Sequence, residues 1–173
     1  MPSARAHDII TATLAPPTFA VTFFLAHSID LSIIATAAML FAGLMFGPDL
    51  DIQSKQYERW GPLGFLWWPY KVTFRHRSRL SHGILLGTAV RVLYFIVVLS
   101  LLVGACLFIY GLLHPQASGK PDAKLLLQQV WGTLRSVERR YFIAAFLGLW
   151  WGATSHTLTD WIYGLWTSTK KIF

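Results

Sequence analysis

Charged residues are scarce in this sequence. Lysine, arginine, aspartate and glutamate together make up 13% of the 173 residues, whereas a soluble globular domain carries about a quarter. Hydrophobic residues make up 54%, and the mean hydropathy is +0.48. The charges are too few to cover a water-soluble globule of this size. The composition therefore indicates a chain whose surface faces a lipid bilayer.

Cysteine is nearly absent as well. Cys106 is the single cysteine and lies inside an apolar run, so an internal disulfide is excluded. Structural zinc sites more often recruit thiolates, so a metal site here has to use histidine and carboxylate ligands. There is no internal repeat and no low-complexity tract, and no cleavage signature predicts a signal peptide.

The net charge is +7. Such a charge can attract nucleic acid, but in a chain this apolar the anionic headgroups of a lipid bilayer are the better counter-charge. We therefore expect the bilayer as a partner and no nucleic acid. Protein partners are not indicated by any feature of the sequence.

Long apolar runs alternate with polar segments along the whole chain. A helix needs about 20 apolar residues to cross a bilayer. We therefore predict an all-α integral membrane bundle with about four transmembrane helices, forming a single domain over residues 1–173. An amphipathic surface helix is predicted within residues 125–137, and a polar and aromatic loop over residues 49–82. The predicted transmembrane helices are residues 9–26, 31–47, 84–113 and 141–166.

Four crossings place both termini and the loop 49–82 on one side of the membrane. That side carries more lysines and arginines than the other, which predicts that it faces the cytoplasm. The membrane would be a bacterial plasma or internal membrane.

The same topology gathers most of the histidines and acids at this cytoplasmic side. They come from the start of the first helix, the end of the second, the start of the third and the second half of the fourth. The residues expected to converge are His7, Asp8, Asp49, Asp51, His76, His82, His156 and Asp160.

These residue types are those of a metal site. His156 and Asp160 are four positions apart, so they share one helix face and can hold one ion together. Ligands of histidine and aspartate suit Zn2+ first, with Mn2+ or Fe2+ as alternatives, and one or two ions are expected. We predict metal ligation by six residues and give Asp51 the role of a catalytic base or of an orienting residue. The six predicted ligands are His7, Asp49, His76, His82, His156 and Asp160.

A metal-free arrangement is the alternative for the same residues. Asp49 and Asp51 would then cap the loop or pair with Arg59, and His156 would form a hydrogen bond with Asp160 to hold the fourth helix. A bis-histidine haem site is weaker, because only His156 lies clearly inside a predicted membrane span.

The motifs also resemble a known family. In order along the chain they are His7-Asp8, Gly47-Pro48-Asp49-Leu50-Asp51, His76-Arg77-Ser78-Arg79-Leu80-Ser81-His82-Gly83 and Ser155-His156-x-x-x-Asp160. They look like those of a bacterial family of metal-binding membrane proteins of unknown function. More distantly they resemble membrane-bound metal-dependent hydrolases of the YdjM type, and more weakly zinc-dependent phospholipase C. The resemblance implies ligation by His7, Asp49, His76 or His82, His156 and Asp160.

The first functional hypothesis is a metal-dependent hydrolase. Arg75, Arg77 and Arg79 surround His76, and guanidinium groups match phosphate oxygens, so a phosphoester substrate is expected, with a lipid headgroup as one candidate. The second hypothesis is a non-enzymatic metal-binding scaffold, in which protein side chains fill every position around the ion.

Overall fold

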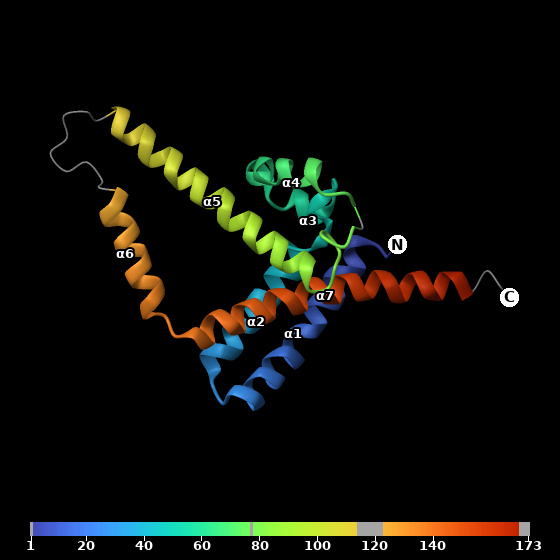
Figure 1. The fold of residues 1–173 in the computed structure, drawn as a ribbon. Helices are drawn as coiled ribbons and strands as arrows, with labels where there is room; N and C mark the ends of the chain where they lie inside the picture. The colour runs from blue at the N-terminus through green and yellow to red at the C-terminus, as the bar shows by residue number, and fades with distance from the viewer. Residues whose placement is uncertain (1, 77, 114–122, 170–173) are drawn as a thin grey trace. The chain divides into compact units, whose positions relative to one another are not determined.

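The computed structural model describes residues 2–76, 78–113 and 123–169, and this described part is built from helices, without strands (Figure 1). The helices are α1 (Ala4–Ala26), α2 (Ile29–Leu44), η1 (Pro48–Asp51), α3 (Lys55–Glu58), η2 (Gly61–Trp67), α4 (Trp68–Thr73), α5 (Leu86–Leu113), α6 (Ala123–Ser136) and α7 (Arg139–Thr169).

The chain forms two compact units. One comprises Met1–Arg91 with Arg140–Phe173, and the other comprises Val92–Arg139. The second unit holds most of α5 and the amphipathic α6, which covers the surface helix predicted from the sequence. All the predicted site residues lie in the first unit, so its three long helices decide how the site is built.

A tight turn joins α1 to α2. The backbone N–H of His27, in the left-handed region at φ 48°, donates to the Phe23 carbonyl at 2.8 Å and ends α1. Ser28 then caps α2, because its side chain accepts from the Leu31 N–H at 3.4 Å. The two helices therefore run antiparallel. The start of α1 and the end of α2 lie at the same end of the hairpin.

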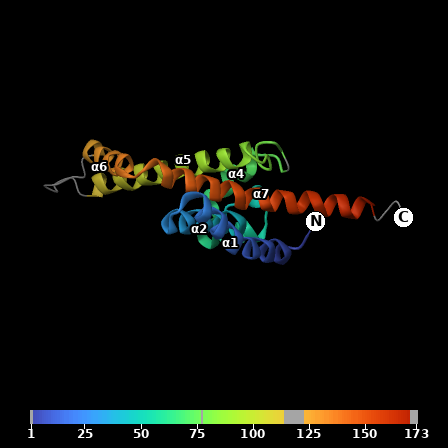
Figure 2. The same cartoon turned by 90° about the horizontal axis from the view of Figure 1, so that it is seen from below.

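Small residues let α7 pack closely on α2, and Figures 1 and 2 both show α7 lying along the hairpin. A Cβ atom at Gly152 would meet the Met39 carbonyl, and one at Gly148 would meet the Ala35 carbonyl. Two glycines four positions apart on one helix face are typical of close helix packing in membranes. Since His156 lies one turn beyond Gly152, this packing brings the middle of α7 to the end of α2.

The segment predicted as a loop, residues 49–82, contains four short helices instead. Prolines occupy the first turns of η1, η2 and α4, where their missing N–H costs no hydrogen bond. Trp67 is fully buried, and its ring packs edge-on against Phe46 at 5.3 Å, Trp60 at 5.2 Å and Tyr70 at 5.8 Å. This aromatic core makes the segment a folded layer.

Within the described residues, three segments are long and apolar enough to cross a membrane. They are α1, Ile29–Asp51 and α5. The fourth predicted span lies in α7, which is not among them. Its central turns carry Thr154, Ser155, His156 and Asp160, and these polar residues lower its apolar character.

Candidate metal centre

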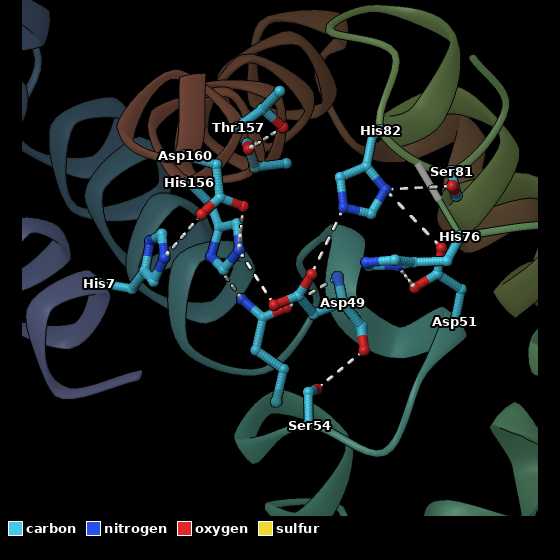
Figure 3. A network of polar contacts seen from close by, with 12 residues as sticks. His7, Asp49, Asp51, Ser54, His76, Ser81, His82, His156, Thr157 and Asp160 are labelled. Atoms are coloured by element: carbon cyan, nitrogen blue, oxygen red, sulfur yellow. Dashed lines mark hydrogen bonds and ion pairs between the residues drawn. The ribbon is translucent and has the colours of Figure 1, made fainter. Parts of the chain in front are cut away.

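Four parts of the first unit meet at one point, and Asp49 lies in the middle of it (Figure 3). Two groups of three side chains there can each hold a metal ion. The first triad is His7, His156 and Asp160, and the second triad is Asp49, His76 and His82. In each triad the three ligand atoms lie within 4.8 Å of one another. The structure thus brings together all six residues for which metal ligation was predicted.

The first triad joins the start of α1 to the middle of α7. The Nε2 atom of His7 is 3.3 Å from Oδ1 of Asp160, and Nε2 of His156 is 3.8 Å from Oδ2 of the same carboxylate. The two imidazole rings stack with centroids 3.9 Å apart. Both histidines are buried, and the Asp160 carboxylate lies against their Nε2 atoms.

Asp49 connects the two triads. Its Oδ2 atom is 3.2 Å from Nε2 of His156, and its Oδ1 atom is 3.4 Å from Nε2 of His82. Figure 3 shows this carboxylate between His156 on one side and His82 on the other. Each oxygen of one side chain therefore faces a different triad, which is the arrangement of a carboxylate that bridges two ions.

Asp51 lies behind the second triad. Its Oδ1 atom is 2.8 Å from Nδ1 of His76, and its Oδ2 atom is 3.7 Å from Nδ1 of His82. The Ser81 hydroxyl oxygen is a further neighbour of Nδ1 of His82, at 3.1 Å. With Nδ1 of both rings facing these oxygens, Nε2 remains available for an ion, since a partner on one ring nitrogen fixes the tautomer and orientation.

Several buried polar atoms at the centre make no well-formed hydrogen bond among the described residues, although each lies 3.2–3.4 Å from another atom of the two triads. They are Asp49 Oδ1, His82 Nε2, His156 Nε2 and Asp160 Oδ1. Leaving such atoms unsatisfied in a buried site costs free energy. A divalent ion removes this cost, because imidazole nitrogens and carboxylate oxygens are its ordinary ligands. The donor set therefore fits a metal centre.

Gln56 is a residue of the site that the sequence patterns did not reveal. Its Oε1 atom accepts from the Asp49 backbone N–H at 3.2 Å, and its Nε2 atom donates to the Gly43 carbonyl at 2.8 Å. The same Nε2 atom is 3.4 Å from Nδ1 of His156. In this orientation Gln56 favours a proton on Nε2 of His156. Metal ligation through that nitrogen therefore requires the proton to move to Nδ1 and the Gln56 amide to turn.

Arg59 pairs with a different acid from those proposed in the metal-free alternative. Its guanidinium donates to both carboxylate oxygens of Asp8, at 2.9 and 2.5 Å, and to the Leu44 carbonyl at 2.7 Å. The pairing of Arg59 with Asp49 and Asp51 is therefore wrong. Asp8 and Arg59 instead tie the start of α1 to the end of α2, and Asp49 stays free to face the histidines.

Two of the three arginines around His76 are described, and neither is buried at the centre. Arg75 and Arg79 are exposed, and Arg77 lies outside the described residues. The buried arginine is Arg91, near the start of α5, which donates to the Ser81 carbonyl at 2.6 Å and to the Thr88 hydroxyl at 3.4 Å. Arg91 therefore holds the backbone next to His82.

Comparison with known proteins agrees with a metal centre. Residues 2–170 match a family described as "Uncharacterized metal-binding protein" (DUF2227). An uncharacterized protein of Aquifex aeolicus (strain VF5) is 43% identical over 56 residues, which are 32% of this chain and 39% of that protein. The match thus spans about two fifths of this relative's length, and no solved structure matches the chain. Because the family match covers nearly all of the sequence, the chain belongs to the DUF2227 family of metal-binding proteins.

Proposed function

We propose that this protein is a membrane-bound hydrolase that uses two divalent ions to cleave a phosphoester. The observation that carries the proposal is the position of Asp49 between the two triads. His7, His156 and Asp160 would hold one ion and His76 and His82 the other, with Asp49 shared. Zn2+ is the first choice for this histidine and carboxylate set, followed by Mn2+ and Fe2+.

The number of protein ligands favours catalysis over a scaffold. Six side chains divided between two ions, with one of them shared, leave positions open for water and substrate, as in catalytic metal sites. Bound divalent ions supply Lewis acidity, which activates water and stabilises negative charge on a phosphoryl oxygen. In the hydrolysis, a water oxygen forms a bond to phosphorus, the ester P–O bond breaks and the alcohol leaves with a proton.

A polar cavity of about 230 Å³ gives access to the first triad. Its lining includes Asp49 and Asp160 from the centre and, further out, Ser54, Lys55 and Arg59. Lys55 is paired with Glu58 and Arg59 with Asp8, so these two side chains would have to turn toward a phosphate group that entered here. Arg75 and Arg79 remain candidates for phosphate contacts at the surface.

Embedding in a bilayer belongs to the same proposal. The three apolar segments and, as a fourth span, α7 would cross the membrane, and the metal centre would face the cytoplasm together with both termini. The exposed aliphatic and aromatic side chains of α1 and α5, such as Phe24, Leu25, Leu101 and Phe108, support this placement. The membrane would be a bacterial plasma or internal membrane.

Asp51 is assigned the role of a positioning residue. Asp51→Asn is expected to weaken metal binding about 10- to 100-fold, because residues that orient ligating histidines have effects of that size. The measurement is competition for zinc with a chelator of known affinity. Asp30→Asn, at an exposed position on α2, is the matched control. Equal affinities for the two variants would remove Asp51 from the metal site.

The direct test of the proposed activity uses detergent-purified protein loaded with Zn2+ or Mn2+. Release of p-nitrophenol from p-nitrophenyl phosphate and bis(p-nitrophenyl) phosphate is expected, with loss of release after chelation and in His156→Ala. Metal-loaded protein that hydrolyses neither ester would contradict the hydrolase and favour the scaffold.

A further inference from the structure

A second opening to the metal centre lies along α7. This groove, of about 410 Å³, is lined by His82, Thr157, Asp160, Trp161, Gly164, Leu165 and Ser168, and we call it the α7 groove. His82 belongs to the second triad and Asp160 to the first. The groove therefore reaches both triads from one side, and no part of the proposed chemistry accounts for it.

Two polar side chains that line the α7 groove form hydrogen bonds within their own helix. The hydroxyl of Thr157 donates to the Ala153 carbonyl at 3.3 Å, and that of Ser168 donates to the Gly164 carbonyl at 3.0 Å. Both residues have thus satisfied their donors within α7. Trp161 and Leu165 are 63% and 52% exposed and form the apolar part of the lining. Beyond His82 and Asp160, the large side chains that the groove offers to a ligand are Trp161 and Leu165.

Gly164 keeps the middle of the groove open. A Cβ atom at this position would meet nothing within 4 Å, so the glycine is not needed for helix packing there. From Asp160 to Ser168 the groove follows α7 for about 12 Å, at about 1.5 Å per residue. An extended hydrocarbon chain can lie along such a strip, with its polar end at Asp160.

The polar cavity and the α7 groove share Asp160 but differ in chemistry. The cavity is lined by charged and amide side chains, including Gln53, Lys55 and Arg59, whereas the groove beyond Asp160 is lined by Trp161, Gly164, Leu165 and Ser168. A ligand bound across the centre therefore meets polar groups on one side and apolar groups on the other. This asymmetry matches a molecule with a charged head and a hydrocarbon tail.

We propose that the substrate is a phosphate ester of a long-chain alcohol, whose chain occupies the α7 groove while its phosphate lies at the two triads. This assignment rests on the proposed phosphoester hydrolase and names its substrate class. The apolar leaving group is the part that would lie along α7, and the phosphate would face the polar cavity.

Binding of non-hydrolysable alkylphosphonates tests this assignment without turnover. The full chain, in detergent and loaded with Zn2+, is titrated with ethylphosphonate and with dodecylphosphonate. We expect dodecylphosphonate to bind at least tenfold more tightly, since each buried methylene contributes about fourfold. In Gly164→Leu the added side chain fills the groove, and the ratio of the two affinities is expected to fall by at least tenfold.

Gly104→Leu is the control, because a Cβ atom at Gly104 also meets nothing within 4 Å and the position lies on α5, outside the site. This variant is expected to prefer dodecylphosphonate over ethylphosphonate as strongly as the wild type does. It therefore corrects for the partition of dodecylphosphonate into detergent. If the ratio of the two affinities were the same in Gly164→Leu and Gly104→Leu, the assignment would be overturned. The groove would then be a surface that contacts bulk lipid. If the preference for dodecylphosphonate depended on Gly164 but the protein had no phosphoesterase activity, the binding site for the hydrocarbon chain would be supported. Only the proposed hydrolase activity would then be contradicted.

Discussion

Asp49→Ala is expected to lower the metal content of the purified protein from two ions per chain to none after dialysis. The reason is that Asp49 is the one side chain facing both triads, with Oδ2 3.2 Å from His156 and Oδ1 3.4 Å from His82. Without the negative charge of Asp49, the two divalent ions would lie side by side with one carboxylate fewer between them. The measurement is elemental analysis of dialysed protein.

Two other variants make this result specific. His7→Ala removes a ligand from the first triad alone and is expected to leave about one ion bound, because the second triad stays intact. Asp30→Ala changes an exposed acid outside the site and is expected to leave both ions bound. Retention of both ions in Asp49→Ala would show that the carboxylate does not bridge them.

Gly152→Leu is expected to prevent stable folding of the first unit. A side chain at this position would collide with the Met39 carbonyl, with Ala42 and with the Gly43 backbone, so α7 would have to move away from α2. Forcing extra atoms into a packed interface costs about 1–3 kcal/mol when side chains can adjust, and backbone atoms adjust less. Because His156 follows one turn later, bound metal should be lost together with stability.

The folding prediction is measured by thermal unfolding in detergent and by the yield of non-aggregated protein. Gly104→Leu makes the same change on α5 where there is open space and should unfold at the wild-type temperature. If Gly152→Leu unfolded at that temperature too and kept its metal, close packing of α7 on α2 would not position the first triad.

The sequence was sufficient to predict which residues meet, because helix length and order largely decide this. A hairpin of two long apolar helices necessarily brings His7, before the first, near Asp49, after the second. The spacing of His156 and Asp160 then places both on one face of α7, and Figure 3 shows that face turned toward Asp49. These conclusions depend only on the helical repeat and on how many times the chain reverses direction between long helices.

Other parts of the centre could not be predicted, because they depend on how folded segments pack. Gln56 reaches the site through contacts with the Gly43 carbonyl and the Asp49 N–H, and no periodic pattern marks it. Glu58, Asp51 and Asp49 are all nearer to Arg59 in the sequence than Asp8 is, and only the fold shows that Arg59 pairs with Asp8. The burial of Trp67 follows from the aromatic cluster around it, although tryptophan in such a segment is also typical of a membrane interface.

The relation between the two triads is likewise a property of the fold. Asp49 and Asp51 are two positions apart, and either could have faced the histidines of α7. Since both lie in the single turn of η1, their carboxylates point to different neighbours, Asp49 toward His156 and Asp51 toward His76. The sequence predicted one or two ions, and the bridging position of Asp49 now favours two.

The measurement that tests this account most directly is electron paramagnetic resonance of the wild-type protein titrated with Mn2+. Two Mn2+ ions bridged by the Asp49 carboxylate are expected to bind per chain and to give the broadened spectrum of a magnetically coupled pair. Binding of a single ion, or of two ions that show the sharp hyperfine pattern of isolated Mn2+, would contradict a dinuclear centre built around Asp49.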